Sequence, residues 1–204
     1  MASAVEPPTE SDPESAAWLA AGDPVRGLAR RLEAKFKRRI TGQLVVPALE
    51  GRYAPLPADL DPRLAAALAG RGIERLYSHQ LEAWETARLG RHVVVVTPTA
   101  SGKTLCYNLP VLHDALTRRT KALYLFPTKA LAQDQVAELL ELNEAGGLGV
   151  RAYTFDGDTP GDARKAVRTR GDVVVSNPDM LHQGILPHHT KWAQFFENLR
   201  YIVV

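Results

Sequence analysis

A short stretch of the chain combines the residue types that proteins use to bind phosphate groups. Thr97–Thr104 consists of Thr-Pro-Thr-Ala-Ser-Gly-Lys-Thr, and it lies between the β-branched run Val93–Val96 and the helix-compatible segment Leu105–Leu116. A strand, a tight loop and a helix that begins with Gly-Lys-Thr are the parts of a P-loop. In such a loop, backbone N–H groups surround the phosphates, Lys103 reaches the β- and γ-phosphates, and the Thr104 hydroxyl binds Mg²⁺. The spacing therefore predicts a nucleotide site.

Strand-like and helix-like segments alternate around this loop. Val93–Val96 is expected to be a strand buried on both faces. Helices are expected to begin near Thr128, Pro160 and Pro178. Further apolar strands are expected at residues 121–126, 150–155, 173–175 and 201–204. This alternation predicts an α/β fold in which helices cover both faces of a parallel sheet. Ligands of such sheets bind at the carboxyl ends of the strands, where the polar motifs lie.

The N-terminal residues have a different composition. Residues 1–23 carry five acidic side chains and no Lys or Arg, which predicts a disordered acidic leader. Residues 24–60 form an extension that contains a basic amphipathic helix, because residues 24–40 carry seven cations against Glu33 and have apolar residues at helical spacing. This helix either packs as an ordinary solvated helix or contacts nucleic-acid phosphates. Residues 61–204 form the main domain, with a helix bracketed by Asp61 and Gly70 and another from Ser78 to Gly90.

The overall composition excludes several classes of protein. Of 204 residues, 45% are hydrophobic and 24% are charged, as in an ordinary globular domain. The single cysteine, Cys106, excludes a disulfide framework, and we expect it to be a buried small hydrophobe. No apolar run is long enough to cross a membrane, and the N-terminus lacks a signal-peptide pattern, so we expect a cytoplasmic protein with no membrane partner.

Several motifs in a fixed order resemble superfamily-two DEAD/DEAH-box helicases. Pro98–Thr104 resembles motif I of that family, and Pro127–Leu131 with the following Gln133, Asp134 and Gln135 is similar to motif Ia. Asp156–Pro160 resembles motif Ib, and Ser176–His182 is similar to the next motif. Leu76–Gln80 resembles the glutamine motif, 23 residues before Lys103. The residues of these motifs most resemble those of the YprA-type branch, DNA helicases related to the RecQ group. The resemblance covers residues 60–204.

The resemblance implies a RecA-like P-loop domain that uses ATP and Mg²⁺ and contacts nucleic acid, with DNA favoured over RNA. In the family, Gln80 would hydrogen-bond the adenine. The nucleotide-binding set would be Gln80, Thr99, Ala100, Ser101, Gly102, Lys103 and Thr104, with Lys103 and Thr104 catalytic and Thr104 at the Mg²⁺. The set along the nucleic-acid strand would be Thr128, Lys129, Gly157, Asp158, Ser176 and Asn177. Helix N-termini at such positions bind phosphates independently of base sequence.

The residues also leave other interpretations open. Gln80 could be a polar residue in the first turn of a helix, and Thr128 and Asn177 are natural helix caps whatever they bind. The chain differs from the commonest family forms at Ala100, where glycine is frequent, and at Asn177, where threonine is usual.

The end of the chain bears on activity. In the family, an Asp-Glu pair follows a strand of the type formed by residues 201–204, and a second RecA-like domain supplies an arginine finger. We therefore expect this piece to be a catalytically incomplete part of a helicase. One alternative is a non-catalytic nucleotide or nucleic-acid binding module. Another is a small P-loop kinase or GTPase that uses Asp156 as its magnesium-binding acid.

Overall fold

The chain divides into two units, Met1–Glu50 and Gly51–Val204, of which a computed structural model describes residues 24–42, 44 and 50–204. In the first unit, helix α2 spans Pro24–Phe36, as the helical period predicts. The expected disorder of the acidic leader at residues 1–23 lies outside the described residues. Among the described helices, none has the length and apolar character needed to cross a membrane.

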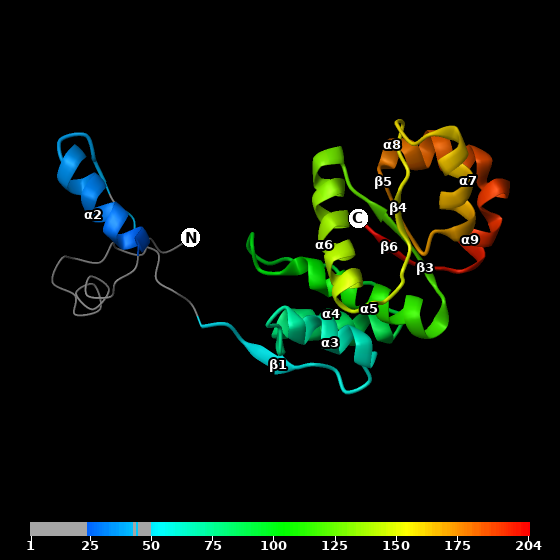
Figure 1. Cartoon of the computed structure of the whole chain (residues 1–204), viewed down its shortest axis with the longest axis horizontal. Helices are drawn as coiled ribbons and strands as arrows, with labels where there is room; N and C mark the ends of the chain where they lie inside the picture. The colour runs from blue at the N-terminus through cyan, green and yellow to red at the C-terminus, as the bar shows by residue number, and fades with distance from the viewer. Residues whose placement is uncertain (1–23, 43, 45–49) are drawn as a thin grey trace, which may run out of the picture. The chain divides into compact units, whose positions relative to one another are not determined.

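The second unit alternates strands and helices (Figure 1). Its elements in chain order are β1 (Tyr53–Pro55), α3 (Pro62–Gly70), β2 (Arg75–Tyr77), α4 (Ser78–Arg88), α5 (Lys103–Arg118), β3 (Lys121–Leu125), α6 (Lys129–Ala145), β4 (Ala152–Thr154), α7 (Gly161–Arg170), β5 (Val173–Ser176), α8 (Pro178–Met180), the π-helical turn η1 (Leu181–Ile185), the 3-10 segment η2 (Leu186–Trp192), α9 (Ala193–Glu197) and β6 (Leu199–Val203). Asp61 caps α3 by accepting the Arg63 N–H at 3.0 Å, as the sequence predicts.

The main sheet has the strand order β4-β5-β3-β6, and every neighbouring pair is parallel. Strand β3 lies inside the sheet because β5 pairs with one of its edges and β6 with the other. All five residues of β3 are buried, which explains its continuous apolar character.

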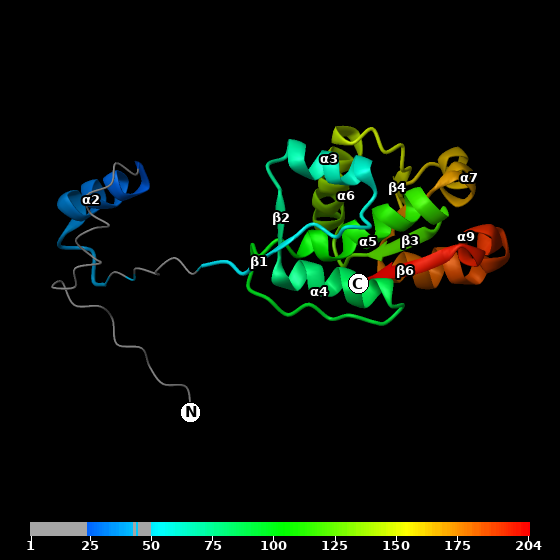
Figure 2. The same cartoon turned by 90° about the horizontal axis from the view of Figure 1, so that it is seen from below.

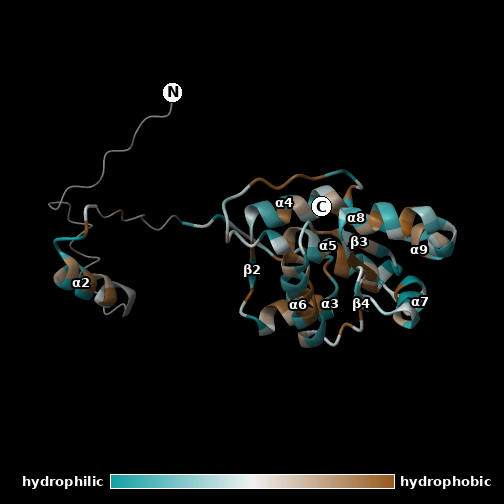
Figure 3. Ribbon diagram, turned by 90° about the horizontal axis from the view of Figure 1, so that it is seen from above, coloured by the Kyte–Doolittle hydropathy of each residue, from teal (hydrophilic) through white to brown (hydrophobic). Residues whose placement is uncertain are grey.

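Helices cover both faces of this sheet, which confirms the predicted α/β fold. Ala122 and Tyr124 of β3 belong to the hydrophobic core that the sheet shares with α3, α4, α5 and α6. Leu123 and Leu125 alternate with them and pack on the other face, against α7, η2 and α9. The hydropathy colouring of Figure 3 shows an apolar interior and a polar surface, with brown on the central strand β3 and teal on the outer helix α7.

The prediction of a buried strand at Val93–Val96 is wrong in this structure. The segment between α4 and α5 runs as an extended coil (Figure 2) and pairs with no strand among the described residues. Val94 and Val96 are 87% and 90% exposed. A β-branched run becomes a buried strand only where tertiary packing brings it beside a partner strand, and among the described residues this segment does not pair with the outer strand β6 or β4.

The region before α3 contains a short strand. The sequence assigns residues 24–60 to an N-terminal extension, but β1 lies within them and pairs antiparallel with β2, with Tyr53 opposite Tyr77. Leu60 is buried in the core of the second unit. This compact unit therefore begins at Gly51, before the boundary at residue 61 that the sequence indicates.

Candidate nucleotide and nucleic-acid sites

The phosphate-loop residues precede α5 in a tight turn with two left-handed residues. Gly102 precedes the helix at a φ of +72°, a conformation that glycine adopts without steric cost. Ala100 has a φ of +61°, and a side chain in this region costs roughly 1–2 kcal/mol. This left-handed conformation explains why glycine is frequent at this position in the family. This chain has alanine there and bears the cost of the side chain.

The glutamine-motif residues fix the backbone of this loop from the side. Gln80 is 3% exposed, donates from Nε2 to the Gly102 carbonyl at 2.8 Å, and accepts the Tyr77 N–H at Oε1 at 2.9 Å. Nε2 of His79 lies 3.0 Å from the Ser101 carbonyl oxygen. A carbonyl only accepts, so this hydrogen bond requires the proton on Nε2 of His79.

Gln80 is therefore a support of the loop in this structure, and its contact with adenine stays a prediction. The sequence motif includes His79, but the residue pattern alone gave no reason to expect its bond to the loop. That bond depends on the approach of α4 to the loop, which only the tertiary structure contains.

The Lys103 side chain folds back over the loop. Its Nζ donates to the carbonyl oxygens of Thr97 at 3.0 Å and Pro98 at 2.8 Å. Across the same turn, the hydroxyls of Thr97 and Ser101 are 2.6 Å apart and hydrogen-bonded. The ammonium group thus lies on the loop backbone, as a phosphate-binding lysine requires. Thr99 belongs to the same turn, but no side-chain contact defines a role for it.

Thr104 connects the start of α5 to α6. Its hydroxyl donates to Oε1 of Gln135 at 3.4 Å, and the Tyr107 hydroxyl donates to the same oxygen. Gln135 lies in the segment that resembles motif Ia, but its contact with the P-loop helix was not predicted. Within the described part of the chain, no group of three or more His, Cys, Asp or Glu side chains could hold a metal ion. Among the predicted site residues, Thr104 offers Mg²⁺ one oxygen, that of its hydroxyl.

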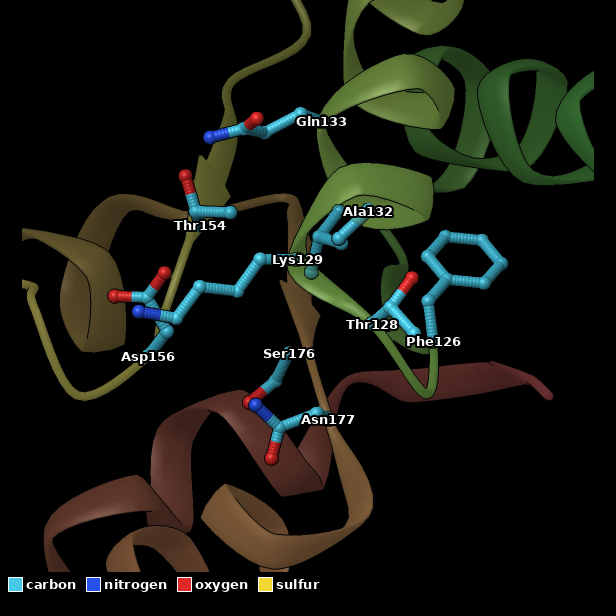
Figure 4. Close-up of a pocket in the computed structure, with 10 residues that line it drawn as sticks. Phe126, Thr128, Lys129, Ala132, Gln133, Thr154, Asp156, Ser176 and Asn177 are labelled. Carbon is cyan, nitrogen blue, oxygen red and sulfur yellow. The ribbon is translucent and has the colours of Figure 1, made fainter.

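A pocket at the carboxyl ends of β3, β4 and β5 gathers most of the predicted nucleic-acid residues (Figure 4). Thr128, Lys129, Ser176 and Asn177 line it, together with Asp156. The carboxyl ends of parallel strands meet at one sheet edge, which is why residues so far apart in sequence meet here.

Each of these side chains has a defined partner. Thr128 caps α6 by accepting the Leu131 N–H at 3.3 Å, and Asn177 caps α8 by accepting the Met180 N–H at 2.8 Å. Ser176 is buried and donates to the Phe155 carbonyl at 2.6 Å, so its hydroxyl fixes the strand ends. The predicted caps at Thr128 and Asn177 are confirmed.

The Asp156–Thr159 loop closes one side of the pocket. Asp156 accepts the Asp158 N–H at 3.0 Å, and Arg164 donates to the Gly157 carbonyl at 3.4 Å. Lys129 forms an ion pair with Asp158. This hydrogen bond raises the pKa of the Lys129 ammonium and lowers the pKa of the Asp158 carboxyl. Asp156 was considered as a magnesium-binding acid of a kinase, but no phosphate-loop residue lines its pocket.

Comparison with known proteins agrees with this geometry. A family model described as DEAD/DEAH box helicase matches residues 77–204. The chain belongs to this family, which confirms the resemblance seen in its motifs and rules out the kinase or GTPase alternative. Membership implies the use of ATP.

Particular relatives confirm the YprA-type branch. The uncharacterized ATP-dependent helicase YprA of Bacillus subtilis is 54% identical over 156 residues, which are 76% of this chain and 21% of YprA. The crystal structure of the DUF1998 helicase MrfA bound to DNA and AMPPNP matches with a TM-score of 0.74 and 52% identity, over 77% of this chain and 22% of MrfA. The DEAD-box helicase Mss116, at 16% identity and a TM-score of 0.57, shares the fold. This chain spans about a fifth of the length of YprA.

Proposed function

We propose that this chain is the ATP-binding part of an ATP-dependent DNA helicase, in which ATP hydrolysis drives movement along a DNA strand. The observation that carries the proposal is that Gln135 of α6 accepts hydrogen bonds from Thr104 and Tyr107, two residues of the P-loop helix α5. These bonds connect the P-loop helix to α6, and the N-terminus of α6 supplies Thr128 and Lys129 to the pocket. A motor needs such a connection between its nucleotide and its track.

The nucleotide end of the proposal assigns one task to each side chain. Lys103 exchanges its bonds to the Thr97 and Pro98 carbonyls for bonds to the β- and γ-phosphates. Gln80 and His79 hold the loop backbone open for the phosphates through the carbonyls of Gly102 and Ser101.

A magnesium ion bound with the nucleotide would neutralise charge on the phosphates. The described residues offer it the Thr104 hydroxyl, which has only the long 3.4 Å bond to Gln135 to give up. Mg²⁺ in nucleotide sites takes most of its ligands from phosphates and water, so a single hydroxyl fits this demand.

The nucleic-acid end contacts the backbone of a DNA strand. The N-terminus of α6 carries backbone N–H groups without an intrahelical partner and the positive end of a helix dipole, and Lys129 exchanges its ion pair with Asp158 for a phosphate. None of these groups identifies a base, so binding is independent of sequence. The DNA in the MrfA structure supports DNA as the partner.

A binding experiment tests the nucleotide site and the nucleic-acid site separately. A fluorescent ATP analogue and a labelled single-stranded oligonucleotide are titrated into the wild-type chain, Lys103→Ala and Lys129→Ala. Lys103→Ala is expected to weaken binding of the analogue at least tenfold and to leave oligonucleotide binding unchanged, and Lys129→Ala is expected to do the reverse. Lys165→Ala, an exposed lysine on α7, is the control and should change neither.

Two results would contradict the proposal. If Lys103→Ala binds the ATP analogue as tightly as the wild type, the loop is not the phosphate site. If Lys129→Ala and Lys165→Ala affect the oligonucleotide equally, the pocket does not lie on the DNA track.

A further inference from the structure

Helix α2 and the turn that follows it carry a concentrated positive charge. Residues 24–40 contain seven Lys and Arg side chains and one acidic residue, Glu33. Arg31 and Lys35 are four residues apart and lie on one face of α2. Arg38 lies in the turn after the helix, where the N–H groups of Arg39 and Ile40 both bond to the Phe36 carbonyl. All three cations are exposed.

The positive charge of the chain is concentrated in this segment. Residues 24–40 carry +6, residues 1–23 carry −5, and residues 41–204 carry +1, which together give the formal net charge of +2. Like charges at this density repel one another along the helix unless a polyanion neutralises them.

We propose that α2 is a second nucleic-acid contact of this chain, which binds the phosphate backbone independently of base sequence. Its site lies in the N-terminal extension, outside the residues that match the helicase family. Arg31 and Lys35 on one face of α2, with Arg38 in the turn beyond it, supply three exposed cations that can neutralise neighbouring phosphates. The contact does not depend on ATP binding.

A lipid surface is the competing partner for the same helix. A membrane-surface helix also combines cations with an apolar face, and Leu28, Leu32 and Phe36 recur every four residues along α2. We favour a nucleic acid because the second unit of the same chain belongs to the DEAD/DEAH helicase family, and the structure of its relative MrfA contains DNA.

The salt dependence of DNA affinity gives a quantitative prediction for this contact. Each phosphate that a protein cation neutralises contributes about 0.9 to the slope of log affinity against log salt for duplex DNA, and about 0.7 for a single strand. Removal of four cations of α2 and its turn is therefore expected to lower the slope by about 3.6 for duplex DNA and by about 2.8 for a single strand.

The test compares variants of the full 204-residue chain by fluorescence anisotropy, without ATP, between about 50 and 200 mM salt. The α2 variant combines Arg31→Gln, Lys35→Gln, Lys37→Gln and Arg38→Gln. The charge-matched control combines Arg119→Gln, Lys165→Gln, Arg168→Gln and Arg170→Gln. A charge-preserving variant combines Arg31→Lys and Arg38→Lys. Circular dichroism checks that each variant keeps its helix.

The α2 variant should lose binding and slope, while the control and the charge-preserving variant should keep most of both. An unchanged slope in the α2 variant would overturn the proposal, and so would an equal loss in the control.

A further arm uses phosphatidylserine vesicles and the pair Leu28→Gln and Leu32→Gln. Vesicle binding that this pair abolishes, with an α2 variant that still binds DNA normally, would assign the helix to a membrane. Lys129→Ala should weaken binding but leave the effect of the α2 substitutions intact, so this contact and the pocket can fail separately.

Discussion

The buried carboxylate of Asp114 should be the most sensitive single position for the stability of the second unit. Asp114 lies in α5 with no solvent exposure. It accepts hydrogen bonds from Arg88 of α4 at 2.8 Å, from Arg200 of β6 at 2.8 Å, and from the Tyr201 hydroxyl at 2.7 Å. One side chain thus connects two helices to the last strand of the sheet.

The expected cost of Asp114→Asn follows from these contacts. Hydrogen bonds to charged groups contribute about 1.5–3 kcal/mol each, and breaking a fully buried ion pair costs about 3–5 kcal/mol. The guanidinium groups of Arg88 and Arg200 are 21% and 34% exposed, so water partly compensates for the lost carboxylate. We therefore expect the free energy of unfolding to fall by about 3 kcal/mol.

Urea unfolding followed by tryptophan fluorescence measures this loss, because Trp84 and Trp192 are buried in the two core layers. Asp59→Asn is the matched control. Asp59 is an exposed partner of the same Arg88 at 3.3 Å, and an exposed ion pair contributes about 0–1 kcal/mol.

A double-mutant cycle with Tyr201→Phe isolates the bond to β6. Burial and the bond to Asp114 raise the pKa of the Tyr201 hydroxyl, so it donates as a neutral group at neutral pH. The coupling should be about 1 kcal/mol. The reasoning is refuted if Asp114→Asn costs no more than Asp59→Asn, or if the cycle shows no coupling.

Three further predictions concern single residues of the second unit. Gly102→Ala should weaken binding of an ATP analogue, measured by fluorescence titration, because the new Cβ would lie 2.7 Å from Nε2 of Gln80 at a φ of +72°; binding equal to the wild type would contradict this. Burial raises the pKa of the Cys106 thiol to about 11, so at about pH 8 mass spectrometry should detect alkylation by iodoacetamide only after unfolding in urea. Burial lowers the pKa of His113, so the unfolded state takes up a proton first as pH falls. The free energy of unfolding should therefore decrease below about pH 6.5, and His113→Gln should remove this dependence.

Local chemistry made many elements of the structure predictable from the sequence. The alternation of apolar runs with helical segments indicated the parallel sheet, and the caps at Asp61, Thr128 and Asn177 marked helix starts. Helix caps and apolar periodicity depend on residues only a few positions apart, so they can be recognised from the sequence alone. The motif order likewise identified the helicase family.

Strand pairing was less predictable. Val93–Val96 has the composition of a central strand but pairs with no strand among the described residues, whereas Tyr53–Pro55 lies in a proline-rich stretch and pairs with β2. A ladder forms between two segments, so its existence depends on which edges other strands have left free.

The sequence by itself determined which helices form and to which family the chain belongs, and it named the candidate phosphate-binding residues, because these depend on residue type and short spacing. Only the tertiary structure decided which groups hold the sites in place. It placed His79 and Gln80 against the phosphate loop, joined Thr104 to Gln135, and enclosed Asp114 among arginines from α4 and β6. These contacts join residues that lie tens of positions apart, and their formation depends on how the helices pack on the sheet.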